Sequence, residues 1–282
     1  MKNCLATILM VLSAAACSYG EIQLGISGGM NWISGSDFNS AMRGMNKLYG
    51  FWFTDIQGSL HELRSAAGWQ AEAVYFFSPN VGVGLSLGAF RPTTDDRVVF
   101  LEANAPGEKL FRSKLLVMPV SLNLHYRLPL ASRWRIDGYA GAGLYLSRFD
   151  FFESHLFESR QQKFVSDFKG NRSAVPGLQG GIALEFQVSP HLSLFLGGGL
   201  RLAVLSPVSG HASTTFTDPS QTLTVADQPG DYYYFDHLYG EESFGYIIFA
   251  QTPPLDDFVR NARKAEISLS GASLSCGIRI GI

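Results

Sequence analysis

Eight ionisable residues stand at alternate positions in segments that are otherwise apolar, and they are the first candidates for chemistry. They are Glu72, His125, Arg127, Arg135, Asp137, Glu185, Arg201 and Arg279. Alternate residues of a β-strand point to one face, so each segment would turn its ionisable groups to one side. Charges withdrawn from water are costly unless they are paired. We therefore expect an internal network of salt bridges; a narrow polar pathway for a small solute is the alternative.

Most of these residues lie within a few positions of the short turns described below, and so at a similar depth. Opposite charges at one depth in a confined space should pair. We expect Glu185 or Asp137 to pair with Arg127 or Arg279.

Other residues with catalytic or ligating side chains show little pattern. His211-Ala212-Ser213 has the His-x-Ser spacing seen in a lipid A deacylase family, but no acid stands at a telling distance. His155, His191 and His237 lack metal-ligand spacing. Gly197-Gly198-Gly199 is not followed by a helix, so it is no phosphate loop. The sequence predicts no catalytic site, no metal site and no cofactor.

Composition excludes several classes of protein. The net charge of −2 over 282 residues does not favour nucleic-acid binding. Charged residues make up 16%, below the roughly 25% of soluble domains. The mean hydropathy is only +0.09, and no apolar run of about 18 residues follows the N-terminus, so a helical membrane protein is not expected. Alternating strands keep mean hydropathy low even in a membrane.

The first 20 residues predict a secretory signal, with Lys2, an apolar core from Leu5 to Leu12 and small residues after it. Ser18-Tyr19-Gly20 favours cleavage after Gly20. Ala14-Ala15-Ala16-Cys17 resembles a lipobox, so acylation of Cys17 stays open. The predicted organisation is a signal peptide, 1–20, and one domain, 21–282. Cys4 and Cys17 lie in the leader, and Cys276 is the one cysteine of the sequence after it. No intrachain disulfide is therefore expected.

A long hairpin from Leu115 to Leu146 organises the chain. From Leu116 to Tyr126 the even positions are apolar, and the odd positions include Ser121, Asn123 and His125. After a break at 128–133 the alternation resumes. Each strand exceeds ten residues, which is long for a soluble sheet but suits a tilted strand that crosses a bilayer.

The same alternation predicts eight strands. Besides the two in the hairpin, they cover about 21–33, 67–77, 81–90, 174–188, 192–203 and 265–282, the last with a bulge near Gly271. Three connections are short: 78–80, 128–133 and 189–191. Four are long, and we expect loops there: 34–66, 91–110, 150–173 and 205–264. Short and long connections alternate strictly.

Two helical segments are expected inside the long connections. Phe38, Ala41, Met42 and Met45 follow Ser36, a possible N-cap, at helical spacing. We expect this helix to pack on the rim of the barrel; a role at the membrane surface or with a partner is the alternative. The second is a helix-like segment with Leu255, Phe258, Val259 and Ala262.

Taken together, this pattern resembles small eight-stranded outer-membrane barrels of the OmpA/OmpX type. The resemblance implies an all-β, transmembrane, antiparallel up-and-down β-barrel with tight periplasmic turns and long extracellular loops that carry short helices. It implies a bacterial outer-membrane location, with outer-membrane lipid and the barrel-assembly machinery as partners. Such barrels usually end in Phe, whereas this chain ends Arg279-Ile280-Gly281-Ile282.

The longest connection, 205–264, is far longer than a link between two strands needs. It contains a run of aromatic and acidic residues that we expect to form either a cap over the mouth or a surface for a ligand or protein. They are Tyr232, Tyr233, Tyr234, Phe235, Asp236 and Tyr239.

These observations predict a non-enzymatic outer-membrane barrel with a plugged polar lumen and large surface loops. A narrow porin-like channel for small or hydrophobic solutes is the first alternative. An outer-membrane lipid-modifying enzyme is the second.

Overall fold

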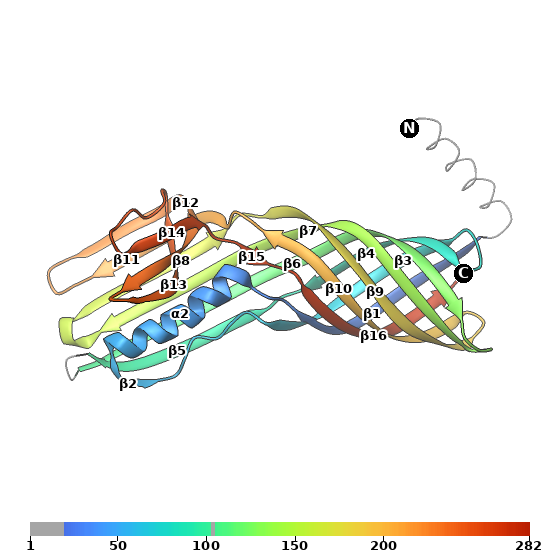
Figure 1. Ribbon diagram of the computed structural model, residues 1–282, viewed down its shortest axis with the longest axis horizontal. Helices are drawn as coiled ribbons and strands as arrows, with labels where there is room; N and C mark the ends of the chain where they lie inside the picture. Colours follow the sequence, from blue (N-terminus) through green and yellow to red (C-terminus); the bar gives the residue numbers. More distant parts are fainter. Residues whose placement is uncertain (1–19, 103–104) are drawn as a thin grey trace, which may run out of the picture.

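The computed structural model describes residues 20–102 and 105–282, which form one antiparallel sheet and one long helix (Figure 1). Apart from Gly20, the expected leader lies outside the described residues, so the choice between cleavage after Gly20 and acylation of Cys17 stays a prediction.

Eight strands form the barrel: β1 (Glu21–Trp32), β3 (Ser65–Phe76), β4 (Val81–Phe90), β6 (Ala105–Pro129), β7 (Trp134–Phe157), β9 (Ser173–Ser189), β10 (Leu192–Leu205) and β16 (Gly271–Gly281). The other elements are α2 (Ser36–Trp52), β2 (Thr54–Gln57), β5 (Thr93–Glu102), η1 (Glu158–Arg160), β8 (Gln162–Gly170), β11 (Ser209–Thr217), β12 (Thr222–Tyr239), β13 (Glu242–Ala250), β14 (Val259–Lys264) and β15 (Ile267–Ser268).

The barrel closes on itself. The order β7-β9-β10-β16-β1-β3-β4-β6 runs through antiparallel neighbours, and β6 pairs with β7 to complete the ring. The predicted eight-stranded up-and-down barrel is therefore confirmed. A closed ring leaves no unpaired edge, which is the condition for a sheet to lie in lipid.

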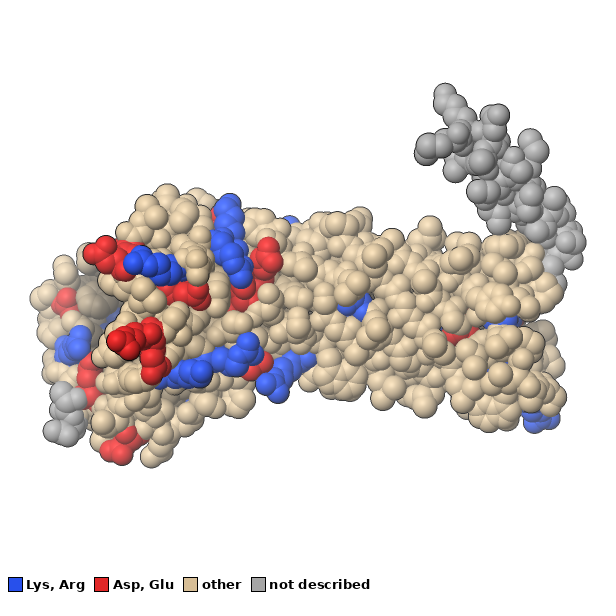
Figure 2. Space-filling view, viewed as in Figure 1, with Lys and Arg blue, Asp and Glu red and all other residues tan. Residues whose placement is uncertain are grey.

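The outer face of the ring is apolar, as the alternation predicted. Leu122, Ile182 and Leu200 are 60%, 63% and 69% exposed, although they belong to the most apolar residue types. Figure 2 shows the same half of the molecule as a broad surface nearly without Lys, Arg, Asp or Glu. This apolar belt fits the hydrocarbon of a bilayer, so the fold is that of a transmembrane barrel. Among the described residues, no helix is both long and apolar enough to cross a membrane.

Three of the four predicted loops consist mostly of strands; in 205–264 these are β11, β12, β13 and β14. β6 and β7 have 25 and 24 residues and stay in register from Pro129↔Arg135 to Gly107↔Phe157. β5 pairs with β6, and β8 pairs with β7, so 91–110 and 150–173 are largely sheet. The alternation continues in these segments, but charged residues replace apolar ones on the outward face, which made them resemble loops.

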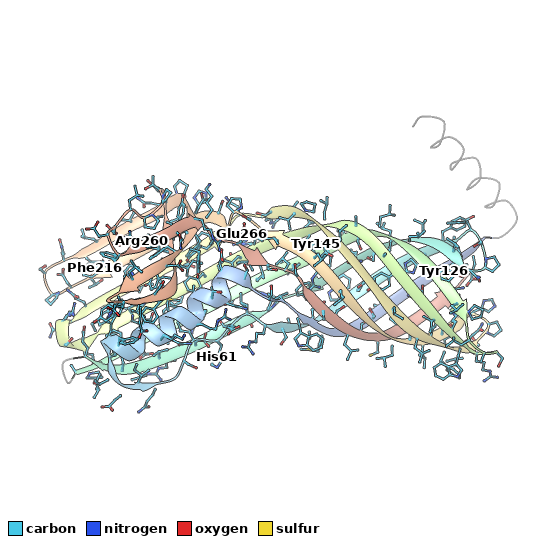
Figure 3. All side chains as sticks on the ribbon, in the orientation of Figure 1. His61, Tyr126, Tyr145, Phe216, Arg260 and Glu266 are labelled. Carbon is cyan, nitrogen blue, oxygen red and sulfur yellow. The ribbon has the colours of Figure 1, made fainter. Side chains whose placement is uncertain are left out.

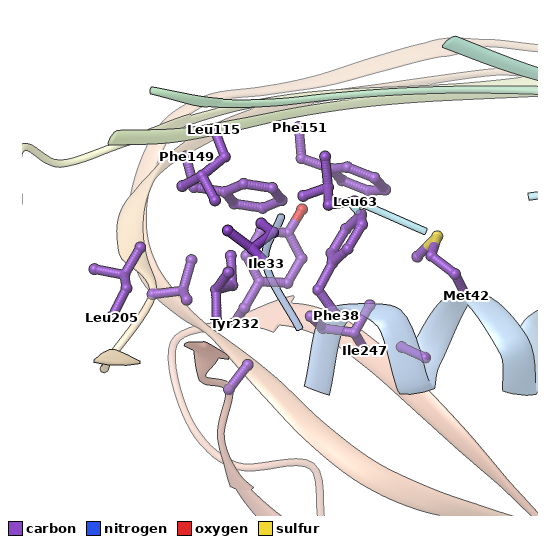
Figure 4. Packing of buried hydrophobic residues seen from close by; sticks show 14 of the residues in the cluster. Ile33, Phe38, Met42, Leu63, Leu115, Phe149, Phe151, Leu205, Tyr232 and Ile247 are labelled. Carbon is purple, nitrogen blue, oxygen red and sulfur yellow. The ribbon is translucent and has the colours of Figure 1, made fainter. Parts of the chain in front are cut away.

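Beyond the barrel these strands form a second region, which we call the extension: residues 34–64, 91–102, 105–115, 149–172 and 206–266. It occupies the end of the molecule opposite the short turns and the C-terminus (Figure 1). β8, β11, β12 and β13 continue its sheet in that order. Its core joins α2 to the inner face of the sheet, with Phe38, Phe149, Phe151 and Tyr232 in contact (Figure 4).

Helix α2 lies inside the extension rather than on the barrel rim. Its predicted apolar face is buried, with Phe38 1% and Ala41 0% exposed. Gly44 lies so close to the Gly245 carbonyl of β13 that a Cβ would overlap it. Ser36 is the first helical residue and not the N-cap; Gly35, at φ 68°, takes the capping position without a side-chain bond.

Two further predictions need correction near the C-terminus. The segment with Leu255, Phe258, Val259 and Ala262 is not helical, because it turns and then pairs as β14 with β12. The last predicted strand, 265–282, is divided into β15 and β16 around Leu269 and Ser270. Gly271 follows this interruption, where a Cβ would overlap the Trp32 carbonyl.

Candidate functional site

Charged side chains from four strands meet inside the barrel near the short turns. Arg279 of β16 contacts Asp137 of β7, lies 3.3 Å from Glu185 of β9 and 3.4 Å from Glu72 of β3. Asp137 and Glu185 are 0% exposed. One guanidinium thus faces three carboxylates that the chain supplies from distant positions. Of the pairs expected for Asp137 and Glu185, those with Arg279 are present and those with Arg127 are not.

His125 lies between two of these carboxylates. Its Nδ1 is 3.2 Å from Asp137 Oδ1, and its Nε2 is 3.1 Å from Glu72 Oε1, without hydrogen-bond geometry in the second case. The ring stacks on Tyr139 at 5.8 Å between centroids. His125 is fully buried, so it belongs to the same cluster.

Two more arginines complete what we call the charged layer. Arg135 donates to Glu185 Oε1 at 2.7 Å and to Ser193 Oγ at 3.0 Å. Arg127 donates to Gln23 Oε1 at 2.6 Å, lies 3.5 Å from Glu21 Oε2 and covers the Phe76 ring. The charged layer consists of Glu72, His125, Arg127, Arg135, Asp137, Glu185 and Arg279.

Next along the lumen is a layer of neutral polar groups that sequence reasoning left out. Gln179 Nε2 donates to Ser121 Oγ at 2.7 Å and to Asn123 Oδ1 at 3.0 Å. Ser86 and Ser121 are 2.6 Å apart, and Tyr145 donates to Gln179 Oε1 at 3.2 Å. Tyr145 lies near the junction of barrel and extension, whereas Tyr126 lies near the short turns (Figure 3). The inward parity of Ser121, Asn123 and Gln179 was visible in the sequence, but the expected network included only ionisable residues.

Arg201 is the one predicted lumen residue that stands apart from the charged layer. It donates to the Leu269 carbonyl at 2.7 Å, to the Trp32 carbonyl at 3.1 Å and to Asn31 Oδ1 at 3.2 Å. Those carbonyls belong to the strand interruption and to the end of β1. Arg201 therefore stabilises the junction of barrel and extension.

Little space is left between these layers. One cavity of about 60 Å³ is lined in part by Tyr139, Gln179 and Arg201, and another of about 30 Å³ by Glu72, Tyr139 and Arg279. Each has room for a few water molecules, whereas pockets for organic ligands measure about 300–1,000 Å³.

The aromatic run in the extension does not form an exposed contact surface, which was one of its two expected forms. Tyr232, Tyr233 and Phe235 are each 4% exposed. Since Tyr232 and Tyr233 point to opposite faces of β12, both faces are covered at this point. Tyr234 and Asp236 are half-buried, and Tyr239 remains 45% exposed. Burial raises the pKa of the Tyr232 hydroxyl well above its ordinary value.

A lysine lies within the aromatic core of the extension. Lys109 is 4% exposed, and its ammonium is 4.0 Å from the centre of the Tyr49 ring, with the Phe53, Phe100 and Phe157 rings within 6 Å. Burial lowers the pKa of Lys109 to about 8, against the weaker attraction of Glu153 and Glu102. The ring faces replace part of the lost hydration.

The extension also contains a hollow of about 410 Å³ between α2, β7, β8, β11, β12 and β13. Its lining is mostly apolar and aromatic: Met45, Phe151, Glu153, His155, Phe164, Ser166, Thr214, Tyr232, Tyr246, Ile247, Ile248 and Phe249. Of the described residues that line it, Glu153 is the only carboxylate, and none is Lys or Arg. His155 Nε2 is buried without a hydrogen-bond partner, 3.7 Å from Glu153 Oε2. Sequence reasoning missed this hollow, because 150–173 was taken for a loop.

The His-x-Ser pair acquires an acid only through tertiary structure. His211 Nδ1 is 3.3 Å from Asp227 Oδ1, and the Asp227 backbone N–H donates to Ser213 Oγ at 3.2 Å. No hydrogen bond joins Ser213 to His211 among the described residues. A serine nucleophile needs that contact with its base, so the trio lacks the arrangement of a hydrolase. Residues 20–102 and 105–282 contain no group of His, Cys, Asp and Glu suited to a metal ion.

Comparisons with known proteins agree with the barrel but are distant. No protein-family model matches the chain, and no curated protein matches it in sequence. Similar solved structures include a major outer membrane protein from Thermus thermophilus, Neisserial surface protein A, and the outer membrane protein OprG from Pseudomonas aeruginosa. Each is 12% identical over 93% of this chain, and the matches cover 99%, 96% and 95% of their own lengths, with TM-scores of 0.37, 0.32 and 0.35. At such values the fold assignment rests on the closed strand ring of this chain.

Proposed function

We propose that this protein is a non-enzymatic outer-membrane barrel whose lumen is plugged and whose extension is a folded recognition domain outside the cell. The observation that carries the proposal is the difference between the two regions of the molecule. The lumen is filled by its own side chains, so the extension is not needed as a lid, and it keeps a ligand-sized hollow of about 410 Å³.

The plug rests on the pairing of opposite charges. Arg279 and Arg135 form ion pairs with Asp137, Glu185 and Glu72, and the neutral layer fills the lumen beyond them. A channel would need a continuous polar path instead. A steady conductance of the protein in planar bilayers would replace the plug with the narrow-channel alternative.

The orientation rests on the expected signal, the short turns and the extension. Outer-membrane barrels have short periplasmic turns and longer external connections. A peptide tag after Ser220, in the exposed turn between β11 and β12, should bind antibody on intact cells. The control tag after Ala131, in a short turn, should bind only after the outer membrane is permeabilised. The opposite result would place the extension in the periplasm.

The hollow suits a small amphipathic molecule that carries a positive charge. Aromatic faces attract cations, and Glu153 lacks a Lys or Arg ion-pair partner among the described residues. A suitable probe is benzyltrimethylammonium, compared with 3-phenylpropanoate. We expect calorimetry to detect the cation and not the anion.

Glu153→Gln should weaken binding of the cation roughly ten-fold, because a charge-assisted contact is lost. Glu242→Gln, an exposed carboxylate on β13, should leave it unchanged. Equal binding of cation and anion, or no effect of Glu153→Gln, would contradict this part of the proposal and leave the plug and the orientation intact.

A further inference from the structure

A group of cations lies on the outer face immediately beyond the apolar belt. On β6 the outward residues change from Leu116 to Lys114, and on β7 from Leu146 to Arg148. The register pairs Leu116 with Arg148 and Lys114 with Asp150. The first charged residues therefore border the last lipid-facing ones, at the level where a bilayer has its headgroups.

These cations surround one hollow of about 310 Å³. Its lining contains five basic and two acidic residues: Arg91, Arg112, Lys114, Arg148 and Lys169, with Asp150 and Asp167. Phe151 and Phe152 complete it. The residues come from β6, β7, β8 and the start of the β4–β5 link, so the sheet holds their spacing. We call this set the basic hollow.

Only part of this positive charge is neutralised within the protein. Arg112 lies 3.0 Å from Asp95, Arg148 2.9 Å from Asp150, and Lys169 3.8 Å from Asp167. Arg91 and Lys114 form no ion pair with another described residue, and both are exposed. Lys114 is one outward position beyond Leu116 on β6, so its charge lies at the edge of the apolar belt, as that of Arg148 does on β7.

We propose that the basic hollow binds the phosphate of a membrane lipid headgroup in the leaflet next to the extension. Arg and Lys donors form strong charge-assisted hydrogen bonds with phosphate oxygens. The acyl chains of such a lipid would lie along Leu116 and Leu146, directly below. A free phosphate would gain the charge contacts but not this apolar surface, which favours the lipid.

This site is separate from the recognition hollow, and its chemistry does not depend on which side of the membrane the extension faces. The bound lipid would stabilise the boundary between the two regions, because it would contact strands of both.

The test uses the full barrel in detergent, with diphosphorylated lipid A as the probe and native mass spectrometry as the readout. The variant Arg91→Gln with Lys114→Gln should lower lipid affinity roughly ten-fold or more, as expected for the loss of two charged contacts. The control, Lys47→Gln with Lys163→Gln, removes the same charge from positions elsewhere in the extension. It should bind as the unmodified protein does. The heat-dependent shift in electrophoresis verifies that each barrel is folded.

Three further measurements decide the ligand chemistry. The charge-keeping variant Arg91→Lys with Lys114→Arg should retain most binding. Fully dephosphorylated lipid A should bind much more weakly than the diphosphorylated form; equal binding would overturn the proposal. Excess inorganic phosphate should displace little lipid, and complete displacement would assign the site to free phosphate instead. An equal loss of lipid affinity in the control variant would attribute the effect to net charge alone and would also overturn the proposal.

Discussion

The barrel and the extension share strands but reverse the chemistry of their faces. Along β6 the outward residues are charged in the extension, as at Arg112, and apolar in the barrel, as at Leu122. The inward residues change the other way, from Phe111 at 1% exposed to the fully buried His125. The parity of the strand never changes. Which face is apolar depends on what surrounds the strand. In the barrel the inward polar groups contact one another, and in the extension the inward aromatic rings contact one another.

The barrel and the extension are stabilised by different interactions. In the barrel, lipid covers the apolar face, and the interior depends on satisfied charges. In the extension, water covers the charged face, and the interior depends on packed rings such as those of Phe149 and Phe168. Equivalent substitutions should therefore have opposite consequences in the two regions.

The largest effect should come from the interior of the barrel. Glu185→Gln removes the charge that Arg135 contacts at 2.7 Å and Arg279 at 3.3 Å. Breaking a buried pair costs about 3–5 kcal/mol, because the partner charge stays buried. Urea unfolding of the barrel in detergent should report this loss. The exposed pair of the extension, Arg97 with Glu108, is the control: Glu108→Gln should cost less than about 1 kcal/mol. Similar costs at both sites would contradict the dependence of the barrel interior on its buried ion pairs.

A smaller effect should come from the outward face. Leu122→Arg puts a charge on the lipid-facing surface, where it should cost about 2–4 kcal/mol near the bilayer midplane. Arg112→Leu makes the reverse change on the same strand and the same face, but in the extension. It should change stability by less than about 1 kcal/mol, since its ion pair is exposed. Refolding into lipid vesicles at several urea concentrations measures both. If the two substitutions cost the same, the proposed membrane boundary between Lys114 and Leu116 is misplaced.

The smallest effect concerns Lys109, whose charge is buried in the aromatic core of the extension. The pKa of Lys109 is about 8 in the fold and about 10.4 in an unfolded chain. Between these values the unfolded chain binds more protons, so folding stability should rise with pH. The penalty is full below pH 8 and declines toward about pH 10.4. Between about pH 7.5 and about pH 9.5 the gain should be about 2 kcal/mol.

Lys109→Met should remove this gain and make the extension more stable at neutral pH. Trp52, which contacts His237 and Tyr239, offers a fluorescence signal for unfolding of this region. An unchanged pH dependence in Lys109→Met would assign the effect to another group.

The local sequence pattern was enough to predict the barrel strands, because the two-residue periodicity is visible in each strand by itself. It identified the lipid-facing residues, such as Ile22 and Leu200, and the inward ones, such as Glu72 and Asp137. The pattern was misleading where the structure of a segment depends on the elements that it packs against. Val259 and Ala262 fit a helix by spacing, yet their segment pairs with β12. Tyr232 and Tyr233 resembled a contact surface, yet each is only 4% exposed.

The sequence by itself determined the strand faces, the short turns and the set of charges that had to share one interior, since these depend on local alternation and turn residues. Only the tertiary structure decided which charges pair, because closing the ring brings Glu72, Asp137 and Glu185 around one arginine, from as far as 207 residues away along the chain. It also decided that β6 and β7 continue beyond the barrel and that α2 packs against the inner face of their sheet. Those outcomes depend on long-range register and on which surfaces meet water, and no single segment contains that information.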